Sequence, residues 1–256
     1  MSKLLVKWAE LWAYFNDLIC RVFLNISWDV EIKGQLDYRS NYLVLANHQS
    51  WADILVLQTI VNRRIPFLRF FIKRELMYVP FLNLAWWALD FPFLRRYSAA
   101  QLRNEPSLMG KDLEIAKKSC EKFKKLPASI LIFAEGTRFS EKRKKILKTP
   151  LNHLLPAKSG GISIALDSMG SLFKSILDIT IVYPQMNPSF WNYVKGVVSP
   201  VIVRVRELEV PDTLLSSNET KTSSLHPLRK KWINDIWAEK DNIIDQLLSS
   251  QFGQKL

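Results

Sequence analysis

Residues 42–61 read YLVLANHQSWADILVLQTIV, and this stretch decides the fold class. Its first five residues, Tyr42 to Ala46, form an apolar run of the length of a strand. A polar turn follows, and residues 51–61 are mostly apolar over a length that indicates a helix. A buried strand that leads through a short turn into a helix is typical of α/β proteins.

The rest of the chain repeats this alternation. Strands are predicted at residues 30–33, 129–133 and 179–183, and an extended segment at 66–73. Helices are predicted at residues 111–125, ended by Pro127, at 159–168 and at about 227–250. Residues 197–205 also read as a strand, and Pro200 inside it favours an edge or bulged position. We therefore expect an α/β fold with a mainly parallel central sheet flanked by helices, and ligands at the carboxyl ends of its strands.

Residues 1–27 are predicted to form an amphipathic helix ahead of the main domain. Its apolar stripe has the helical period and comprises Leu4, Leu5, Trp8, Leu11, Trp12, Phe15, Leu18, Ile19, Val22 and Phe23. The charged residues Lys3, Lys7, Glu10, Asp17 and Arg21 fall on the other face. Such a helix either packs on the protein core or lies in the plane of a membrane surface, and the pattern leaves both open. Residues 28–256 are expected to form one domain, with a polar loop at 211–225.

Composition narrows the classes of partner. The 256 residues include 36 Lys and Arg against 24 Asp and Glu, a formal net charge of +12. This balance favours an anionic partner, which could be nucleic acid, an anionic bilayer or a phosphorylated metabolite. No recognisable nucleic-acid-binding motif is present, so no nucleic-acid partner is expected. Cys20 and Cys120 have no metal or disulfide spacing, and neither a transmembrane helix nor a secretory signal is expected.

The segment after the first strand carries the strongest chemical signal. His48 follows that strand directly, and Asp53 lies at the start of the predicted helix. Ser50 and Asp53 have the Ser-x-x-Asp spacing of a capping box, so Asp53 could serve only the helix start, and a lone His is more often structural. Alternatively, a turn at Gln49 lets Asp53 reach back to the imidazole, fix its tautomer and leave the other nitrogen free as a base.

A second polar motif follows the strand at residues 129–133. It reads Phe133-Ala134-Glu135-Gly136-Thr137-Arg138. Gly136 permits close approach of the backbone, and the guanidinium of Arg138 is a fork of donors suited to a phosphate group. An ordinary turn after a strand is the alternative. Two polar motifs at two strand ends nevertheless indicate a functional site.

The two motifs resemble blocks of the glycerolipid, or plsC-type, 1-acylglycerol-3-phosphate acyltransferase family. The first block of that family is N-H-x-x-x-x-D and the third is F-x-E-G-T-R. A second block resembles Lys73-Arg74-Glu75-Leu76 with Pro80, and a fourth resembles Ile181-Val182-Tyr183-Pro184. The segments Arg95-Arg96-Tyr97-Ser98 and Gly110-Lys111-Asp112 are similar to the bacterial branch close to yihG and the lysocardiolipin-type acyltransferases. Asn83 and Ala134 depart from the Gly and Pro of many relatives, whereas Asp53 differs from the Glu of lipid A late acyltransferases.

The resemblance implies an activity and a set of roles. His48 and Asp53 are expected to be catalytic, and Lys73, Glu135, Gly136, Thr137 and Arg138 to bind the phosphate and glycerol of the acceptor. The acyl group is expected to pass from acyl-CoA or acyl carrier protein to lysophosphatidic acid at sn-2, giving phosphatidic acid, without a metal or other cofactor. Backbone amides at the helix start are expected to stabilise the oxyanion. The enzyme is expected on the cytoplasmic face of the inner membrane. Another lysophospholipid, glycerol 3-phosphate, or an inactive membrane scaffold are the alternatives.

Overall fold

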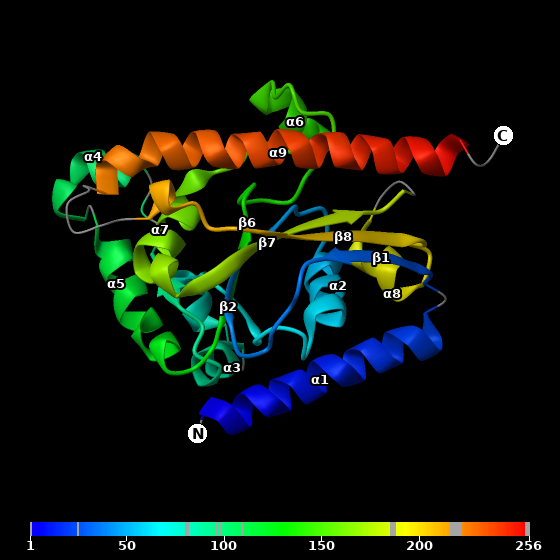
Figure 1. Ribbon diagram of the computed structural model, residues 1–256, viewed down its shortest axis with the longest axis horizontal. Coiled ribbons are helices and arrows are strands. Elements are labelled where there is room, and N and C mark those ends of the chain that lie inside the picture. The colour runs from blue at the N-terminus through cyan, green and yellow to red at the C-terminus, as the bar shows by residue number, and fades with distance from the viewer. Residues whose placement is uncertain are drawn as a thin grey trace.

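A six-stranded sheet forms the centre of the computed structural model, which describes all residues except 1, 25, 80, 81, 96, 98, 109, 185–187, 216–221 and 254–256 (Figure 1). The strand order is β1 (Trp28–Lys33), β8 (Val201–Leu208), β7 (Phe173–Val182), β2 (Asn41–Ala46), β6 (Ser129–Phe133) and β3 (Leu68–Phe70). Neighbouring strands are parallel, except that β7 and β8 are antiparallel. The predicted α/β fold with a mainly parallel sheet is therefore confirmed.

Helices cover both faces of this sheet. They are α1 (Ser2–Phe23), α2 (Ala52–Val61), α3 (Leu82–Ala88), α4 (Ala99–Asn104), α5 (Lys111–Cys120), α6 (Glu141–Leu147), α7 (Ser159–Met169), α8 (Phe190–Val194) and α9 (Thr222–Gly253). Short 3-10 turns occur at η1 (Arg74–Tyr78), η2 (Pro106–Leu108), η3 (Glu121–Lys124), η4 (Gly170–Leu172) and η5 (Asp212–Leu214). A second, two-stranded sheet pairs β4 (Ile72–Lys73) with β5 (Phe93–Leu94).

Strand β2 lies at the middle of the core because both of its faces are covered. Leu43 and Leu45 pack into the apolar cluster that includes side chains of α5, α7 and α9. Tyr42 and Val44 point the other way, into the cluster formed with α2 and the sheet. A strand buried on both faces has no polar side to alternate with, which explains the unbroken apolar run from which it was predicted.

Helix α1 packs on the domain through small residues rather than through its aromatic ones. Ala9 and Ala13 are buried, whereas Trp8 and Trp12 are 64% and 57% exposed. Glu10, which the sequence places on the charged face, is only 6% exposed and accepts a hydrogen bond from the Tyr38 hydroxyl at 2.5 Å. Glu10 therefore lies on the packed side of α1, where Ala9 and Ala13 let the helix approach the domain closely.

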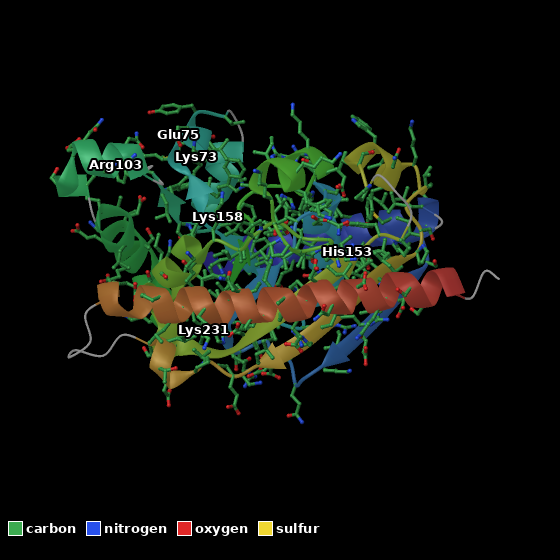
Figure 2. All side chains as sticks on the ribbon, turned by 90° about the horizontal axis from the view of Figure 1, so that it is seen from above. Lys73, Glu75, Arg103, His153, Lys158 and Lys231 are labelled. Atoms are coloured by element: carbon green, nitrogen blue, oxygen red, sulfur yellow. The ribbon has the colours of Figure 1, made fainter. Side chains whose placement is uncertain are left out.

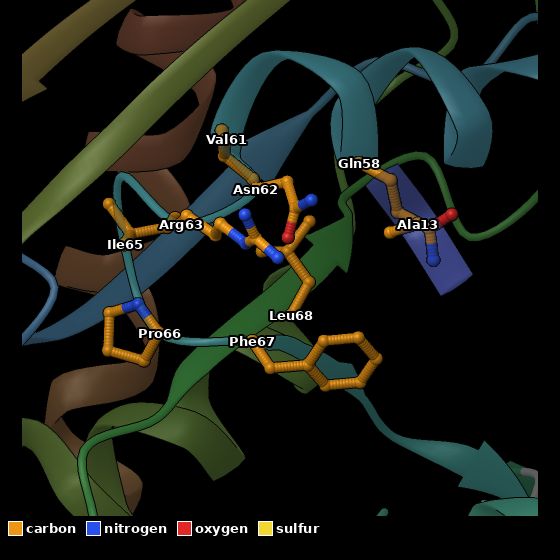
Figure 3. A pocket seen from close by; sticks show the side chains of 9 residues that line it. All are labelled: Ala13, Gln58, Val61, Asn62, Arg63, Ile65, Pro66, Phe67 and Leu68. Carbon is orange, nitrogen blue, oxygen red and sulfur yellow. The ribbon is translucent and has the colours of Figure 1, made fainter. Parts of the chain in front are cut away.

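The close approach of α1 leaves little space between it and the domain. Figure 3 shows the pocket between Ala13 of α1, the end of α2 at Val61 and Asn62, and the chain that enters β3. Its volume of about 10 Å³ has room for roughly one water molecule. The Asn62 side chain closes the contact by donating to the Glu10 carbonyl at 3.1 Å. One side of α1 is therefore packed, and the stripe of large apolar residues lies on the other.

Strands β7 and β8 differ from the sequence-based expectation. β8 lies between β1 and β7 and begins after Pro200, so the prediction of an edge or bulged strand is wrong. β7 begins at Phe173, six residues before the strand predicted at 179–183. The added residues include polar side chains that have partners elsewhere in the fold. Asp178, fully buried, forms ion pairs with Arg206 of β8 at 2.8 Å and with Lys240 of α9 at 2.6 Å. Such pairs between distant segments leave no signal in the local pattern.

The C-terminal helix begins before the predicted residue 227. Helix α9 starts at Thr222 and includes Pro227, while the turn η5 interrupts the predicted loop at 211–225, part of which lies outside the described residues. Ile233, Trp237 and Ile244 of α9 pack into the apolar cluster on one face of the sheet. Figure 1 shows α9 and α1 on opposite sides of the molecule. Within the described ranges, no helix is both long and apolar enough to cross a membrane.

Candidate active site

Two strand ends bring the two polar motifs together. β2 and β6 are parallel neighbours, and Ala46 at the end of β2 pairs with Phe133 at the end of β6. The segment that starts at Asn47 and the segment that starts at Ala134 therefore leave the sheet side by side at its carboxyl edge. The backbone N–H of Phe139 also donates to the His48 carbonyl at 2.7 Å, which ties the two turns to each other.

His48 and Asp53 form a hydrogen-bonded pair. The imidazole Nδ1 lies 2.9 Å from Oδ2 of Asp53, whose side chain is fully buried. The same oxygen accepts the backbone N–H groups of Gln49 at 2.6 Å and Ser50 at 2.8 Å, and Oδ1 accepts the Tyr183 hydroxyl at 2.7 Å. Four donors thus hold the carboxylate in a single orientation against the imidazole.

The start of α2 shows that Asp53 serves the helix and the imidazole together. The predicted capping box of Ser50 and Asp53 is present, although α2 begins at Ala52, because Trp51 between them already has helical backbone angles. Ser50 Oγ accepts the Ala52 N–H at 3.1 Å, while the Asp53 carboxylate accepts the Ser50 N–H. The amides of Gln49, Ser50 and Ala52 are therefore engaged inside the turn, so the expectation that amides here stabilise an oxyanion is wrong for these three.

The imidazole of His48 is also held by an aromatic contact. Its ring stacks on Phe133 with a centroid distance of 4.1 Å and an interplanar angle of 18°, and the side chain is 15% exposed. When Nδ1 donates its proton to Asp53, Nε2 is the nitrogen with a free lone pair. For the part of the chain that the structure describes, no partner of Nε2 is seen. The arrangement can accept a proton from a hydroxyl that enters the site.

Glu135 of the second motif bridges two segments of backbone. Oε1 accepts the His48 N–H at 2.9 Å, and Oε2 accepts the Leu155 N–H at 2.9 Å. Burial raises the pKa of Glu135 to about 7, although these two hydrogen bonds act in the opposite direction. Both carboxylate oxygens are thus occupied by the protein itself. The expected role of Glu135 in binding substrate stays a prediction.

The pKa of Glu135 should be visible in the stability of the protein. A carboxyl with a raised pKa binds its proton more tightly in the folded than in the unfolded chain, so its contribution to the free energy of unfolding is largest below about pH 4.5 and is lost as the pH rises through about 7. Urea unfolding should show wild type losing stability relative to Glu135→Gln by about 1 kcal/mol per pH unit between pH 5 and 7, with a much smaller change between pH 7 and 8. Glu121→Gln, on an exposed residue, is the control, and a constant difference for Glu135→Gln would contradict the assignment.

The remaining residues of the second motif form a basic turn. Gly136 has φ of +68°, a backbone conformation that favours glycine, and a Cβ there would lie 3.2 Å from Cδ of Lys158. Arg138 is exposed, and its guanidinium carbon lies 5.4 Å from the ring centroid of Trp51. Thr137 is partly exposed beside it. Lys158, which the sequence analysis did not single out, belongs to this turn because its N–H donates to the Ala134 carbonyl at 2.7 Å.

Lys73 lies in a different part of the fold. It is an exposed residue of β4 in the second sheet, with Nζ 3.7 Å from Glu75 (Figure 2). Among the contacts of the described residues, none joins it to His48 or Asp53. Its role in binding phosphate therefore stays a prediction. Pro80, Arg96 and Ser98, which contributed to the family resemblance, lie outside the described residues.

Sequence reasoning missed the supports that come from other strands. The Tyr183 hydroxyl reaches Asp53 from the end of β7, and the amide of Asn47 exchanges two 2.8 Å hydrogen bonds with the backbone of Ile181. Both contacts fasten the turn after β2 to the neighbouring strand. A tyrosine at the end of an apolar strand was the available signal, but the sequence alone does not show which strand lies next to β2.

A cavity of about 570 Å³ lies between the start of α1, η1, α3, β5 and α5. Its apolar lining includes Leu5, Met77, Trp87 and Phe93. Its charged lining comprises Arg74, Arg95, and Lys122 paired with Asp90. The shape and chemistry suit a molecule with a hydrocarbon part and an anionic part. In the described segments, no group of three His, Cys, Asp or Glu side chains is placed to hold a metal ion.

Comparisons with known proteins identify a family and several similar sequences. Residues 28–184, more than half of the chain, match the Acyltransferase family. The chain is 25% identical to 1-acyl-sn-glycerol-3-phosphate acyltransferase 2 of Brassica oleracea over 97% of its own length and 62% of the relative's. It is 22% identical to 1-acyl-sn-glycerol-3-phosphate acyltransferase epsilon of Mus musculus, over 83% and 59% of the two chains. The chain thus spans about three fifths of the length of these relatives.

A solved structure has a similar fold. The crystal structure of the 1-acyl-sn-glycerophosphate acyltransferase PlsC from Thermotoga maritima superimposes with a TM-score of 0.51 and 17% sequence identity, covering 90% of this chain and 80% of that one. The matched residues 28–184 contain both polar motifs and the ends of β2, β6 and β7 that carry them. The finer resemblance to the yihG branch stays a prediction. The chain belongs to the Acyltransferase family.

Proposed function

We propose that this protein transfers a fatty acyl group from a thioester donor, acyl-CoA or acyl carrier protein, to the free hydroxyl of a lysophospholipid. The acceptor is lysophosphatidic acid at sn-2, and the product is phosphatidic acid for phospholipid biosynthesis or remodelling. The observation that carries the proposal is the His48–Asp53 pair at 2.9 Å beside the basic turn of Arg138. The curated relatives named as 1-acyl-sn-glycerol-3-phosphate acyltransferases support the choice of acceptor.

The pair accounts for the proton movements of the reaction. Nε2 of His48 takes the proton of the acceptor hydroxyl while the oxygen attacks the thioester carbonyl, and Asp53 stabilises the imidazolium that results. When the tetrahedral intermediate collapses, the carbon–sulfur bond breaks and the thiolate takes the proton back from Nε2. The acceptor supplies the nucleophile, so no acyl-enzyme forms. The scheme requires no metal or other cofactor.

Arg138 and Thr137 are proposed to bind the acceptor phosphate. Arg138→Ala should raise KM for lysophosphatidic acid about tenfold or more, because hydrogen bonds to a charged group are lost, and should leave KM for the donor unchanged. Steady-state kinetics with each substrate varied in turn measures the two constants. Lys142→Ala, an exposed cation on the neighbouring helix α6, is the control for general charge effects. A change confined to the donor KM would move Arg138 to the donor site.

The cavity at the start of α1 offers a place for the hydrocarbon of a lipid substrate. Its apolar side chains, Met77, Trp87 and Phe93 among them, would contact an acyl chain, and Arg74 and Arg95 would favour an anionic lipid. This location also brings the substrate close to α1. It therefore supports an enzyme that takes its substrate from a membrane surface.

Helix α1 is proposed to hold the enzyme on the cytoplasmic face of the inner membrane, in the plane of the interface. Trp8, Trp12 and Phe15 are 64%, 57% and 49% exposed, and an exposed apolar stripe on a helix whose other side is packed favours partition into a bilayer. The net charge of +12 adds attraction to anionic lipids.

Replacing Trp8, Trp12 and Phe15 with serine should release the protein from anionic vesicles. Burial of one CH₂ group contributes about 0.8 kcal/mol to the free energy of membrane binding. The loss of three aromatic side chains should therefore remove most of the binding free energy of a peripheral helix. Vesicle sedimentation measures binding, and transfer to a short-chain soluble acceptor should stay normal. The control replaces Ile146 and Leu147, exposed apolar residues of α6, with serine. Binding by the triple variant equal to wild type would contradict the proposed anchor.

The direct test of the function is an acyl-transfer assay with a panel of acceptors. Purified protein in anionic vesicles receives a labelled acyl thioester, as CoA or acyl carrier protein, and lysophosphatidic acid, four other lysophospholipids or glycerol 3-phosphate. We expect the highest kcat/KM with lysophosphatidic acid and the same rate with and without EDTA. A preference for another acceptor would correct the substrate. The absence of transfer to every acceptor would favour an inactive membrane scaffold.

A further inference from the structure

Helix α9 contacts the segment that supports the candidate active site. Asp241, 5% exposed, accepts two consecutive backbone N–H groups: Oδ2 accepts that of Asn152 and Oδ1 that of His153, each at 2.7 Å. One turn later, Asp245 lies 3.0 Å from Nε2 of His153, which Figure 2 places beside α9. Short bonds from a carboxylate to two backbone donors fix a segment more firmly than side-chain contacts do.

From this segment a chain of contacts leads to His48. Leu155, two residues after His153, donates its N–H to Oε2 of Glu135, and Oε1 of the same carboxylate accepts the N–H of His48. Leu154 and Leu155 are buried, so the segment cannot shift without moving core side chains. The position of the His48 backbone therefore depends on where residues 152–155 lie.

Helix α9 is itself fixed to the central sheet next to Asp241. The Lys240 ammonium is fully buried, donates to the Ile179 carbonyl at 2.6 Å and pairs with Asp178. Burial lowers the pKa of Lys240, and Asp178 opposes this effect. Two successive residues of α9 thus reach different partners, one β7 of the sheet and the other the segment at 152–153. The helix links the sheet to that segment.

We propose that Asp241 is a positioning residue for His48, acting through residues 152–155 and Glu135; this inference rests on the proposed function. Asp241 lies outside residues 28–184, the part that matches the family. It does not contact the imidazole. Its carboxylate sets the backbone from which the His48 side chain extends, and the direction of Nε2 toward the acceptor hydroxyl depends on that backbone.

Substitution of Asp241 should lower kcat without weakening substrate binding. Asp241→Ala should reduce kcat by about 10- to 100-fold, the effect of a misplacement of about 1 Å at a reacting group, and should change neither KM by more than about twofold. Asp241→Asn, which keeps one acceptor oxygen, should recover part of kcat. Asp245→Ala, which loses a contact with the His153 side chain but none with the backbone, should behave as wild type.

Amide hydrogen exchange on the full chain reports positioning independently of turnover. In Asp241→Ala the amides of Leu155 and His48 should exchange faster than in wild type. Asp241→Asn should show the same change to a lesser extent, and it replaces the alanine variant if that variant does not fold. Asp245→Ala should leave both amides unchanged. A normal kcat together with faster exchange, or slow exchange at His48 in both Asp241 variants, would overturn the proposal. Absence of acyl transfer by wild type would overturn the proposed function. The exchange rate of the His48 amide would still test the link to Asp241, so the two failures can be distinguished.

Discussion

Replacing His48 with alanine is expected to abolish acyl transfer and to leave the fold intact. General base catalysis contributes about 10²- to 10⁴-fold, and without Nε2 the acceptor hydroxyl has no group to take its proton. The side chain is partly exposed and makes one hydrogen bond, to Asp53, and one stacking contact, with Phe133. Its loss should therefore cost only about 1–2 kcal/mol of stability. Transfer to lysophosphatidic acid measures activity, and thermal unfolding followed by circular dichroism checks the fold.

The control for this variant is His153, the other histidine among residues 28–184, which lies outside the pair with Asp53. His153→Ala removes a side chain of similar exposure that contacts α9 through Asp245, and it should retain most of the activity. If the His48→Ala protein is folded and still transfers acyl groups at the wild-type rate, the proposed base is wrong. An equal loss in both variants would point to a general sensitivity of this region instead.

Replacing Asp53 with asparagine should lower kcat by about 10³- to 10⁴-fold. The neutral amide has no negative charge with which to stabilise the imidazolium that forms on His48. Its oxygen can still accept the backbone N–H groups of the turn, and its NH₂ group can donate to the Tyr183 hydroxyl, so we expect a loss of only about 1–2 kcal/mol in stability. The ratio of the two effects separates a catalytic carboxylate from a residue that only caps α2.

Tyr183→Phe is the matched variant for Asp53→Asn. It removes one donor to Oδ1 of Asp53 and keeps the negative charge beside the imidazole. Activity should fall by less than about tenfold, in keeping with the loss of one buried hydrogen bond. If Asp53→Asn turns over at nearly the wild-type rate, Asp53 serves only the helix start and the pair has no catalytic role.

The geometry of the candidate site follows from the sequence where local order and the pairing of neighbouring strands determine it. The apolar strand at residues 42–46, the turn and the helix that follows place His48 and Asp53 within five residues of each other, and no distant contact is needed to bring them together. The strand at 129–133 is also local, and its bounds agree with β6. Parallel pairing then brings Arg138 and His48 to one edge of the sheet.

What the sequence does not predict depends on contacts between distant segments. Tyr183 reaches Asp53 across 130 positions, and Lys240 reaches Asp178 from α9. Pattern analysis assigns polar residues to the surface, so the strand predicted from residue 179 is shorter than β7, in which Asp178 is buried with its partners. Pro200 suggested an edge strand, but it lies just before β8, where it interrupts no pairing.

The most direct test of the account is the release of thiol from an acyl thioester, followed continuously before and after lysophosphatidic acid is added. Wild type should release no stoichiometric burst of thiol without the acceptor, should release thiol steadily once the acceptor is present, and should form one phosphatidic acid for each thiol. The His48→Ala protein should stay at background throughout. A burst before the acceptor is added, or release that does not depend on His48, would contradict direct transfer by the His48–Asp53 pair.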